Sequence, residues 1–210
     1  MTADLLRLMQ WLSPAFPTGA FAYSHGLEAV ISDGEVTNAA SAQDWLSDIL
    51  QFGAGWQDAV LLACALRPDA DHADLGDYAR ALAPSRERLA ETLDQGTAFA
   101  RAVAALGVTV DAAPLPVAMG QAARGLDLPA EQIIALYLHS FAANLVSVAV
   151  RFVPLGQSDG QRVLAALHPT ILDLATRAAT ADLTDLTTAS FRADLAAMRH
   201  ETMDIRIYRT

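Results

Sequence analysis

The chain contains no lysine, because all 14 of its basic residues are arginine. This excludes chemistry that depends on a primary amine, such as a Schiff base to pyridoxal phosphate or the phosphate-binding lysine of a P-loop. Cysteine is nearly absent, and Cys64 alone can form neither an internal disulfide nor a cysteine-rich zinc site. Positive charge is also scarce. With 24 acidic residues the formal net charge is −10, which argues against nucleic acid as a partner.

Long uninterrupted hydrophobic runs are missing too. Residues 133–153 approach the length that crosses a bilayer, but they are interrupted by polar side chains and by Arg151. A charge at bilayer depth costs several kcal/mol, so this segment is interpreted as a buried helix of a water-soluble core, with no membrane partner. No secretory signal pattern is visible, and we therefore expect a cytoplasmic protein.

What the sequence does contain favours an all-α fold. Apolar residues make up 53% of the 210 residues, and they recur mainly at spacings of three and four. No alternating strand pair with a tight turn is visible. We predict a single globular multi-helix domain of about ten helices over residues 1–198, followed by a C-terminal tail, residues 199–210.

The predicted helices have recognisable starts. Ser41 with Asp44 and Ser158 with Gln161 have the spacing of capping boxes, and Pro129 suits a first helical position. The expected helices cover residues 3–12, 24–33, 39–67 with a break near Gly53 and Gly55, 72–83, 85–106, 114–125, 129–152, 158–167, 169–180 and 185–200. Residues 13–22, SPAFPTGAFA, contain two prolines and a glycine and predict a bent, packed loop, here called the opening loop.

Catalytic motifs are missing. The chain has no G-x-S-x-G and no glycine-rich phosphate loop, so an enzyme is disfavoured. The histidines are scattered, and no pair has the spacing of a strong metal site, so no metal ligands are assigned. They are His25, His72, His139, His168 and His200. On its apolar helix, His139 is more simply a hydrogen-bonded core residue than a ligand.

A polar stripe runs along the predicted helix 129–152. Its members are spaced by three and four, which places them on one face of the helix. They are Tyr137, Ser140, Asn144, Ser147 and Arg151. Two interpretations stay equally open: hydrogen bonds between helices, or the lining of a subunit interface or watery passage.

Four separated segments resemble the urease accessory protein UreF family. They are SPAFPTGAFAYSHGLE (13–28), SRERLAETLDQGTAFAR (85–101), NLVSVAVRFVPLGQSDGQ (144–161) and RHETMDIRIYRT (199–210). They occur in the family's order from end to end. The chain departs from the family pattern at His25, where glutamine is common, at Met203–Ile205 and at Tyr208, where phenylalanine is usual.

The resemblance implies an all-helical, cytoplasmic, non-catalytic assembly factor for nickel insertion into apo-urease. Such a protein would act in a complex with UreD (UreH in some systems) and the GTPase UreG, and would couple the GTPase state to metal transfer. Nickel would pass through the complex, so no tightly bound cofactor is expected. A homodimer stays open as a further assembly.

The resemblance also implies roles for individual residues. Partner binding is expected of Pro17, Gly19, Tyr23, Ser24, Glu28, His200, Glu201, Thr202, Arg206, Tyr208 and Arg209. The polar stripe, together with Pro154, Gly156 and Gln157, is expected to form an interface or nickel passage. The alternative function is a direct nickel carrier or a small helical enzyme that uses His200 with Glu201, or His139. The scattered histidines argue against it, because a tight carrier gathers several ligands in one place.

Overall fold

The computed structural model describes residues 2–210, and over these residues it contains helices and no strand, which confirms the predicted all-α fold. The α-helices are α1 (Ala3–Trp11), α2 (Leu27–Ser32), α3 (Ala39–Phe52), α4 (Ala54–Ala65), α5 (His72–Ala81), α6 (Arg86–Ala104), α7 (Leu115–Ala123), α8 (Ala130–Phe152), α9 (Gln157–Ala166), α10 (His168–Ala178) and α11 (Phe191–His200). Two short 3-10 turns are η1 (Ala20–Ala22) and η2 (Leu183–Asp185).

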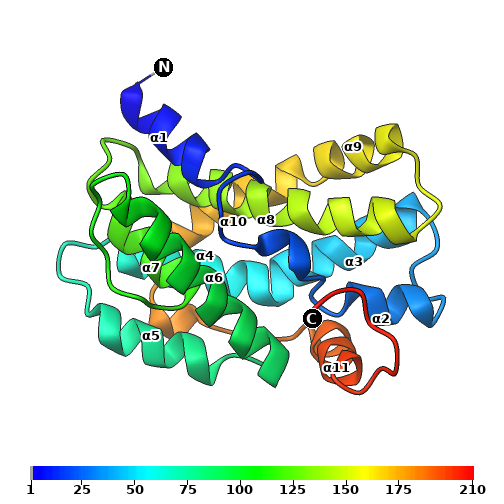
Figure 1. The fold of residues 1–210 in the computed structure, drawn as a ribbon. Helices are drawn as coiled ribbons and strands as arrows, with labels where there is room; N and C mark the ends of the chain where they lie inside the picture. Colours follow the sequence, from blue (N-terminus) through cyan, green and yellow to red (C-terminus); the bar gives the residue numbers. More distant parts are fainter. Residues whose placement is uncertain (1) are drawn as a thin grey trace.

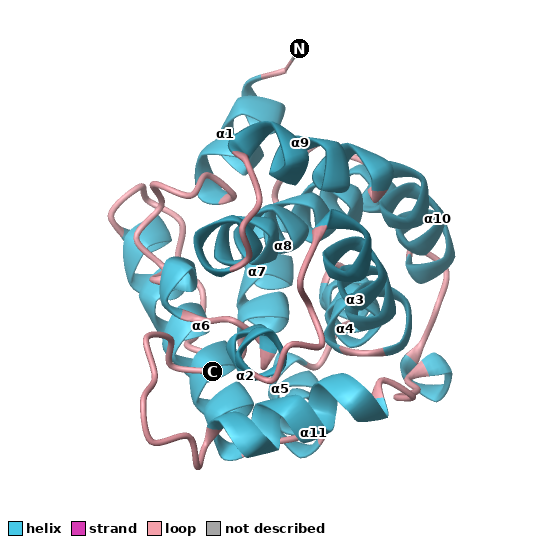
Figure 2. Cartoon of the chain, turned by 90° about the vertical axis from the view of Figure 1, so that its right-hand side faces the viewer, coloured by secondary structure: helices cyan, strands magenta, loops and turns pink. Residues whose placement is uncertain are grey.

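Helix α8 is the central helix. It packs against α2, α3, α4, α9 and α10, and Figures 1 and 2 show the other helices arranged around it. It is long and apolar enough to cross a bilayer, but Ile133, Leu138 and Leu145 on it are buried against neighbouring helices. The interpretation of this segment as a core helix fits that packing.

Aromatic contacts hold the N-terminal part of the chain against α6. The ring of Phe99 on α6 meets Trp11 edge-on at a centroid distance of 6.0 Å and Phe16 of the opening loop at 5.9 Å. Phe99 is completely buried. Because offset and edge-on aromatic pairs add to the free energy of burial, these contacts fix the opening loop over α6.

Three predicted helix starts are wrong in detail. Asn38, not Ser41, caps α3; Ser41 is the third helical residue and completes a reciprocal capping box with Asn38. Ser158 lies inside α9, whose N-cap is Gly156, and Pro129 precedes α8 as its N-cap. Helices α3 and α9 thus start one or two residues before the serine that resembles a cap, whereas α8 starts one residue after Pro129.

Two predicted helices are shorter than expected. The helix predicted at 24–33 begins only at Leu27, because His25 and Gly26 both adopt positive φ. The helix predicted at 185–200 begins at Phe191, because the segment before it is extended and the amide of Ala189 donates to the carbonyl of Phe52. The predicted break near Gly53, by contrast, separates α3 from α4 as expected.

The C-terminal segment packs back on the helices. The predicted boundary between residues 198 and 199 falls inside α11, and the chain then returns toward α2 (Figure 1). Tyr208 and Thr210 are buried, and the amide of Arg209 donates to the carbonyl of Ala22. Residues 199–210 are therefore part of the same packed unit as the helices.

Candidate functional site

The polar stripe of α8 lines one cavity of about 370 Å³, here called the large cavity. All five stripe residues, Tyr137, Ser140, Asn144, Ser147 and Arg151, contribute to its wall. The opening loop forms the opposite side through Pro14, Thr18 and Phe21, among others. Apolar walls come from Trp11, Met119 and Phe141. The stripe therefore faces a loop and an open space.

Two stripe residues also hold the opening loop in place. The hydroxyl of Ser140 donates to the carbonyl of Leu12 at 2.8 Å, and the side-chain amide of Asn144 donates to the carbonyl of Ala20 at 2.9 Å. Such bonds satisfy one carbonyl just before the opening loop and one in its short turn η1. Further along the helix, Ser147 and Arg151 are exposed. Within this chain the stripe thus makes hydrogen bonds and lines a cavity, and its role as a subunit interface or watery passage stays a prediction.

His25 lies where the large cavity meets a second, smaller one. Among residues 2–210 it is the one non-glycine residue with positive φ, at 55°. Its ring is buried and meets Phe141 edge-on at 4.7 Å. A left-handed conformation costs an ordinary residue about 1–2 kcal/mol, so the surrounding contacts must hold it. Strain of this kind is concentrated at functional sites.

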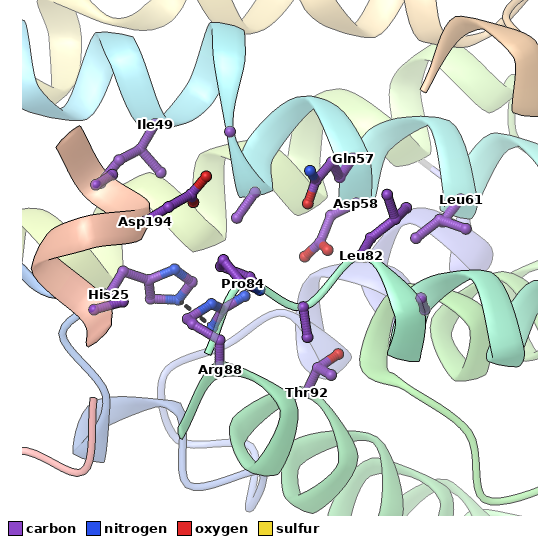
Figure 3. Close-up of a pocket in the computed structure, with 16 residues that line it drawn as sticks. His25, Ile49, Gln57, Asp58, Leu61, Leu82, Pro84, Arg88, Thr92 and Asp194 are labelled. Atoms are coloured by element: carbon purple, nitrogen blue, oxygen red, sulfur yellow. Dashed lines mark hydrogen bonds between the residues drawn. The ribbon is translucent and has the colours of Figure 1, made fainter. Parts of the chain in front are cut away.

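The small cavity, of about 40 Å³, lies behind His25 and is shown in Figure 3. It is lined by Asp58 of α4 and Arg88 of α6, among others. Two hydrogen-bonded pairs separate the two cavities, and each has one member on either side. The phenol of Tyr137 donates to Asp58 at 2.6 Å, and Arg88 forms an ion pair with Glu91. We call these four residues and His25 the polar wall.

One ring nitrogen of His25 has two different neighbours. Its Nε2 lies 2.8 Å from Oε1 of Glu91 and 3.0 Å from Nη1 of Arg88 (the dashed line in Figure 3). A carboxylate accepts a hydrogen bond and a guanidinium donates one, so Nε2 cannot serve both with the same tautomer. Neutral His25 therefore has two competing hydrogen-bond arrangements within the polar wall.

Burial and charge shift the pKa values of the polar wall in opposite directions. Burial would raise the pKa of Glu91, but Arg88 and His25 outweigh it and lower that pKa to about 2. Burial raises the pKa of Asp58 to about 6, although Arg88 and the bond from Tyr137 oppose the rise. Burial, and then the charge of Arg88, lowers the pKa of His25. Perturbed titratable groups beside a cavity are typical of a functional site.

The partner-binding residues predicted near the start are split between surface and interior. Pro17 is exposed and Gly19 half-buried, whereas Tyr23, Ser24 and Glu28 are buried. Glu28 instead organises the C-terminal segment, because its carboxylate accepts from the amides of residues 207 and 208 at 2.8 and 2.9 Å.

The predicted residues of the C-terminal segment are split in the same way. His200 has no exposed surface, and its two ring nitrogens face Glu28 at 3.0 Å and Glu87 at 2.7 Å. Tyr208 is buried, while Thr202, Arg206 and Arg209 are exposed and Glu201 is half-buried. The exposed apolar side chains of this segment are Ile205, with 81% of its surface accessible, and Ile207, with 69%.

The remaining predicted interface residues lie beyond the end of α8. Pro154, Gly156 and Gln157 are exposed in the connection to α9 and its first turn, and none of them lines the large cavity. The structure thus brings the five stripe residues together with His25 and leaves these three on a separate surface.

Residues 2–210 contain no group of three or more histidine, cysteine or acidic side chains arranged to hold a metal. The carboxylate of Glu201 bonds to Arg86 and to the amide of Glu87, so it does not share a site with the His200 ring. His139 lies beside His168, with ring centroids 5.5 Å apart, and burial and His168 lower the pKa of His139.

Sequence reasoning missed three members of the polar wall: Asp58, Arg88 and Glu91. Charged residues are usually solvated, and nothing in the sequence around these three distinguishes them from residues on an exposed helix face. The available signal was the spacing of Arg88, Glu91 and Gln95 by three and four, which puts them on one face of α6. Gln95 donates to Glu91 at 2.9 Å and lines the large cavity with it.

Comparison with known proteins gives a consistent result. The sequence profile of the UreF family matches residues 36–168. A urease accessory protein UreF from Cereibacter sphaeroides (strain KD131 / KCTC 12085) is 63% identical over the full length of both chains. Proteins of the same name from Paracoccus denitrificans (strain Pd 1222) and Jannaschia sp. (strain CCS1) are 60% and 50% identical, with 99% and 100% of this chain and 97% and 96% of theirs covered. The chain therefore belongs to the UreF family of urease accessory proteins.

Proposed function

We propose that this chain is a non-catalytic assembly factor for nickel insertion into apo-urease. It acts in the cytoplasm in a complex with UreD (or UreH) and the GTPase UreG, and it couples the GTPase state to metal transfer. The large cavity, lined by the polar stripe and His25, is the observation that supports the proposal, because a cavity with polar walls suits the proposed passage of a metal ion.

The lining of the large cavity suits a transient cation. Hydroxyl, amide and carboxylate oxygens come from Thr18, Ser140, Asn144 and Glu91, and an imidazole comes from His25. Nitrogen and oxygen donors of this kind suit Ni²⁺, and donors spread along a wall hold an ion less tightly than a closed cage. Nickel is the cargo of such a passage, and no tightly bound cofactor is required.

Exposed apolar side chains offer docking surfaces for the protein partners. Ile205 and Ile207 lie beside the exposed Arg209, and aliphatic and guanidinium side chains together are favourable at interfaces. A second apolar face lies on α11, where Phe191, Leu195 and Met198 are exposed at spacings of four and three.

A plugging variant tests the passage. Ser147→Leu adds bulk to the large cavity at an exposed position, so the isolated protein should keep its melting temperature and its affinity for UreD and UreG. Apo-urease activated with the variant complex should contain less nickel than with the wild-type complex. Ser158→Leu, at an exposed serine of α9 outside the cavity, is the matched control. Equal nickel content with both variants would contradict the passage.

A direct nickel carrier is the second candidate, and the paired rings of His139 and His168 are the observation that favours it. Equilibrium binding of Ni²⁺ to the isolated chain decides between the two. Tight stoichiometric binding that His139→Ala removes would support the carrier, and its absence would leave the assembly factor.

A further inference from the structure

The polar wall between the two cavities is built from paired side chains. In the Tyr137–Asp58 and Glu91–Arg88 pairs, one member lines the large cavity and the other lines the small one, while His25 lines both. The side chains of these pairs therefore lie between the two cavities.

The guanidinium of Arg88 lies at a point in the polar wall that would suit a metal cation. Its side chain is 10% exposed, and its Nη1 bonds to the Glu91 carboxylate and lies 3.0 Å from Nε2 of His25. An imidazole nitrogen and a carboxylate oxygen only 2.8 Å apart are a donor pair that first-row divalent metals bind. In this structure the guanidinium bonds to the Glu91 carboxylate and competes with that carboxylate for Nε2 of His25.

We propose that Arg88 is a tethered cation that closes the polar wall, and that when it swings out, His25 and Glu91 form a transient nitrogen and oxygen site for Ni²⁺ passing between the cavities. This rests on the proposed function, which makes nickel the cargo. Arg88 is a positioning residue, since it controls the site without contacting the ion.

The two metal ligands, His25 and Glu91, stay in place when Arg88 swings out, because other residues form hydrogen bonds with them. The amide of Gln95 donates to Oε1 of Glu91 at 2.9 Å, and the hydroxyl of Thr210 donates to Oε2 at 3.2 Å. The hydroxyl oxygen of Thr210 also accepts from the amide of His25 at 3.2 Å. Metal ligands that are already held in place bind an ion without a further entropic cost of ordering them.

Competition between Arg88 and the metal follows from charge. A guanidinium a few ångströms from a divalent ion repels it strongly in a partly buried site. Removal of that charge should therefore strengthen Ni²⁺ binding at the wall by on the order of a hundredfold or more. A purely structural ion pair makes no such prediction, because its loss would weaken folding without creating a metal site.

The test uses the full-length isolated protein and nickel chloride alone. Arg88→Met should bind Ni²⁺ far more tightly than the wild type, and the paramagnetic ion should broaden the ring signals of His25 in histidine-labelled NMR spectra. Arg88→Lys keeps a tethered positive charge and should behave like the wild type. Arg88→Met with Glu91→Gln removes the charged oxygen donor and should not bind tightly. If folded Arg88→Met binds nickel no better than the wild type, the proposal is overturned.

Arg88→Met leaves Glu91 buried without its cation and can fail to fold in metal-free buffer. Ni²⁺ should then restore a cooperative melt, because a ligand that binds only the folded state stabilises it, while Mg²⁺ should not. An unfolded variant that nickel does not restore would also overturn the proposal. These measurements involve no urease. If Arg88→Met binds nickel tightly but Ser147→Leu still delivers nickel in full, the metal site at the polar wall is supported and the passage through the large cavity is rejected.

Discussion

At the scale of single residues, the turn at His25 and Gly26 positions the polar wall. Both residues have positive φ, and the turn directs the imidazole between the two cavities. Gly26 is required for a second reason, because a Cβ there would lie 2.6 Å from the backbone nitrogen of Ala197 on α11. The close approach of α11 to α2 thus depends on a residue without a side chain.

The packing at Gly26 predicts that Gly26→Ala and Gly34→Ala lower the free energy of unfolding by different amounts. Gly34 has the same left-handed conformation, with φ of 76°, but has no atom within 4 Å of an added Cβ. Gly34→Ala should therefore cost only about 1–2 kcal/mol for the backbone conformation. Gly26→Ala adds a backbone clash and should cost about 3 kcal/mol or more. Urea unfolding of both variants measures this, and equal losses would contradict the packing at Gly26.

The raised pKa of Asp58 predicts that the free energy of unfolding depends on pH. Its pKa rises from 3.8 to about 6 on burial, so the folded state binds its proton more tightly than the unfolded chain does. The contribution of Asp58 is fully present below pH 3.8 and is lost as the pH rises through 6. Asp58→Asn stays neutral and can still accept from Tyr137. It should raise the free energy of unfolding at pH 8 by about 1–3 kcal/mol, and by much less at pH 4. Urea titrations at both pH values test this, and an equal gain at both would reject it.

At the scale of helices, periodicity predicts which segments are helical but not where each one ends. The stripe of α8 was predictable because its polar residues interrupt an apolar helix. The boundaries of α2 and α11 were not, since they depend on contacts between distant segments, such as the bond from Ala189 to Phe52. Arg88 and Glu91 of the polar wall were missed for the same reason, because their buried contacts include His25 and Thr210, which are distant from them in the sequence.

The C-terminal segment is predicted to dock a partner through a surface that includes its exposed isoleucines. The double variant Ile205→Ser and Ile207→Ser replaces two largely exposed side chains, so its melting temperature should stay within about 2 °C of the wild type. Its affinity for the UreD-type partner should fall at least about tenfold, as for interface hot spots. Leu195→Ser on the exposed face of α11 is the control. A loss with Leu195→Ser only would move the docking surface to α11.

At the scale of the whole molecule, residues 24–28 and the C-terminal segment share one buried polar network. Glu28 accepts from the amides of Ile207 and Tyr208, and the amide of Ser24 donates to the carbonyl of Thr210 at 2.9 Å. His200 joins α11 to α2 and α6 through its two carboxylate partners. The fold class and the stripe could be predicted from the sequence, whereas this network depends on contacts more than 100 residues apart.

Deletion of residues 205–210 should therefore change the fold as well as partner binding. It removes the buried Tyr208 and Thr210 and leaves Glu28 without two of its donors. We expect a cooperative unfolding transition with a melting temperature lower by on the order of 10 °C, from a loss of about 3–5 kcal/mol. Calorimetry of the truncated chain measures the shift. An unchanged melting temperature would mean that the segment contributes nothing to the isolated domain.

The pairing of Ser24 with Thr210 has a consequence for how the protein is made. The two residues are 186 positions apart. At a translation rate of about 5–20 residues per second, the segment around Ser24 leaves the ribosome roughly 10–40 seconds before its partner. During that interval the turn at His25 lacks the hydroxyl that accepts from its amide, and Glu91 lacks one of its donors. The hydrogen bonds that hold His25 and Glu91 in the polar wall are therefore completed only after all the helices have been synthesised.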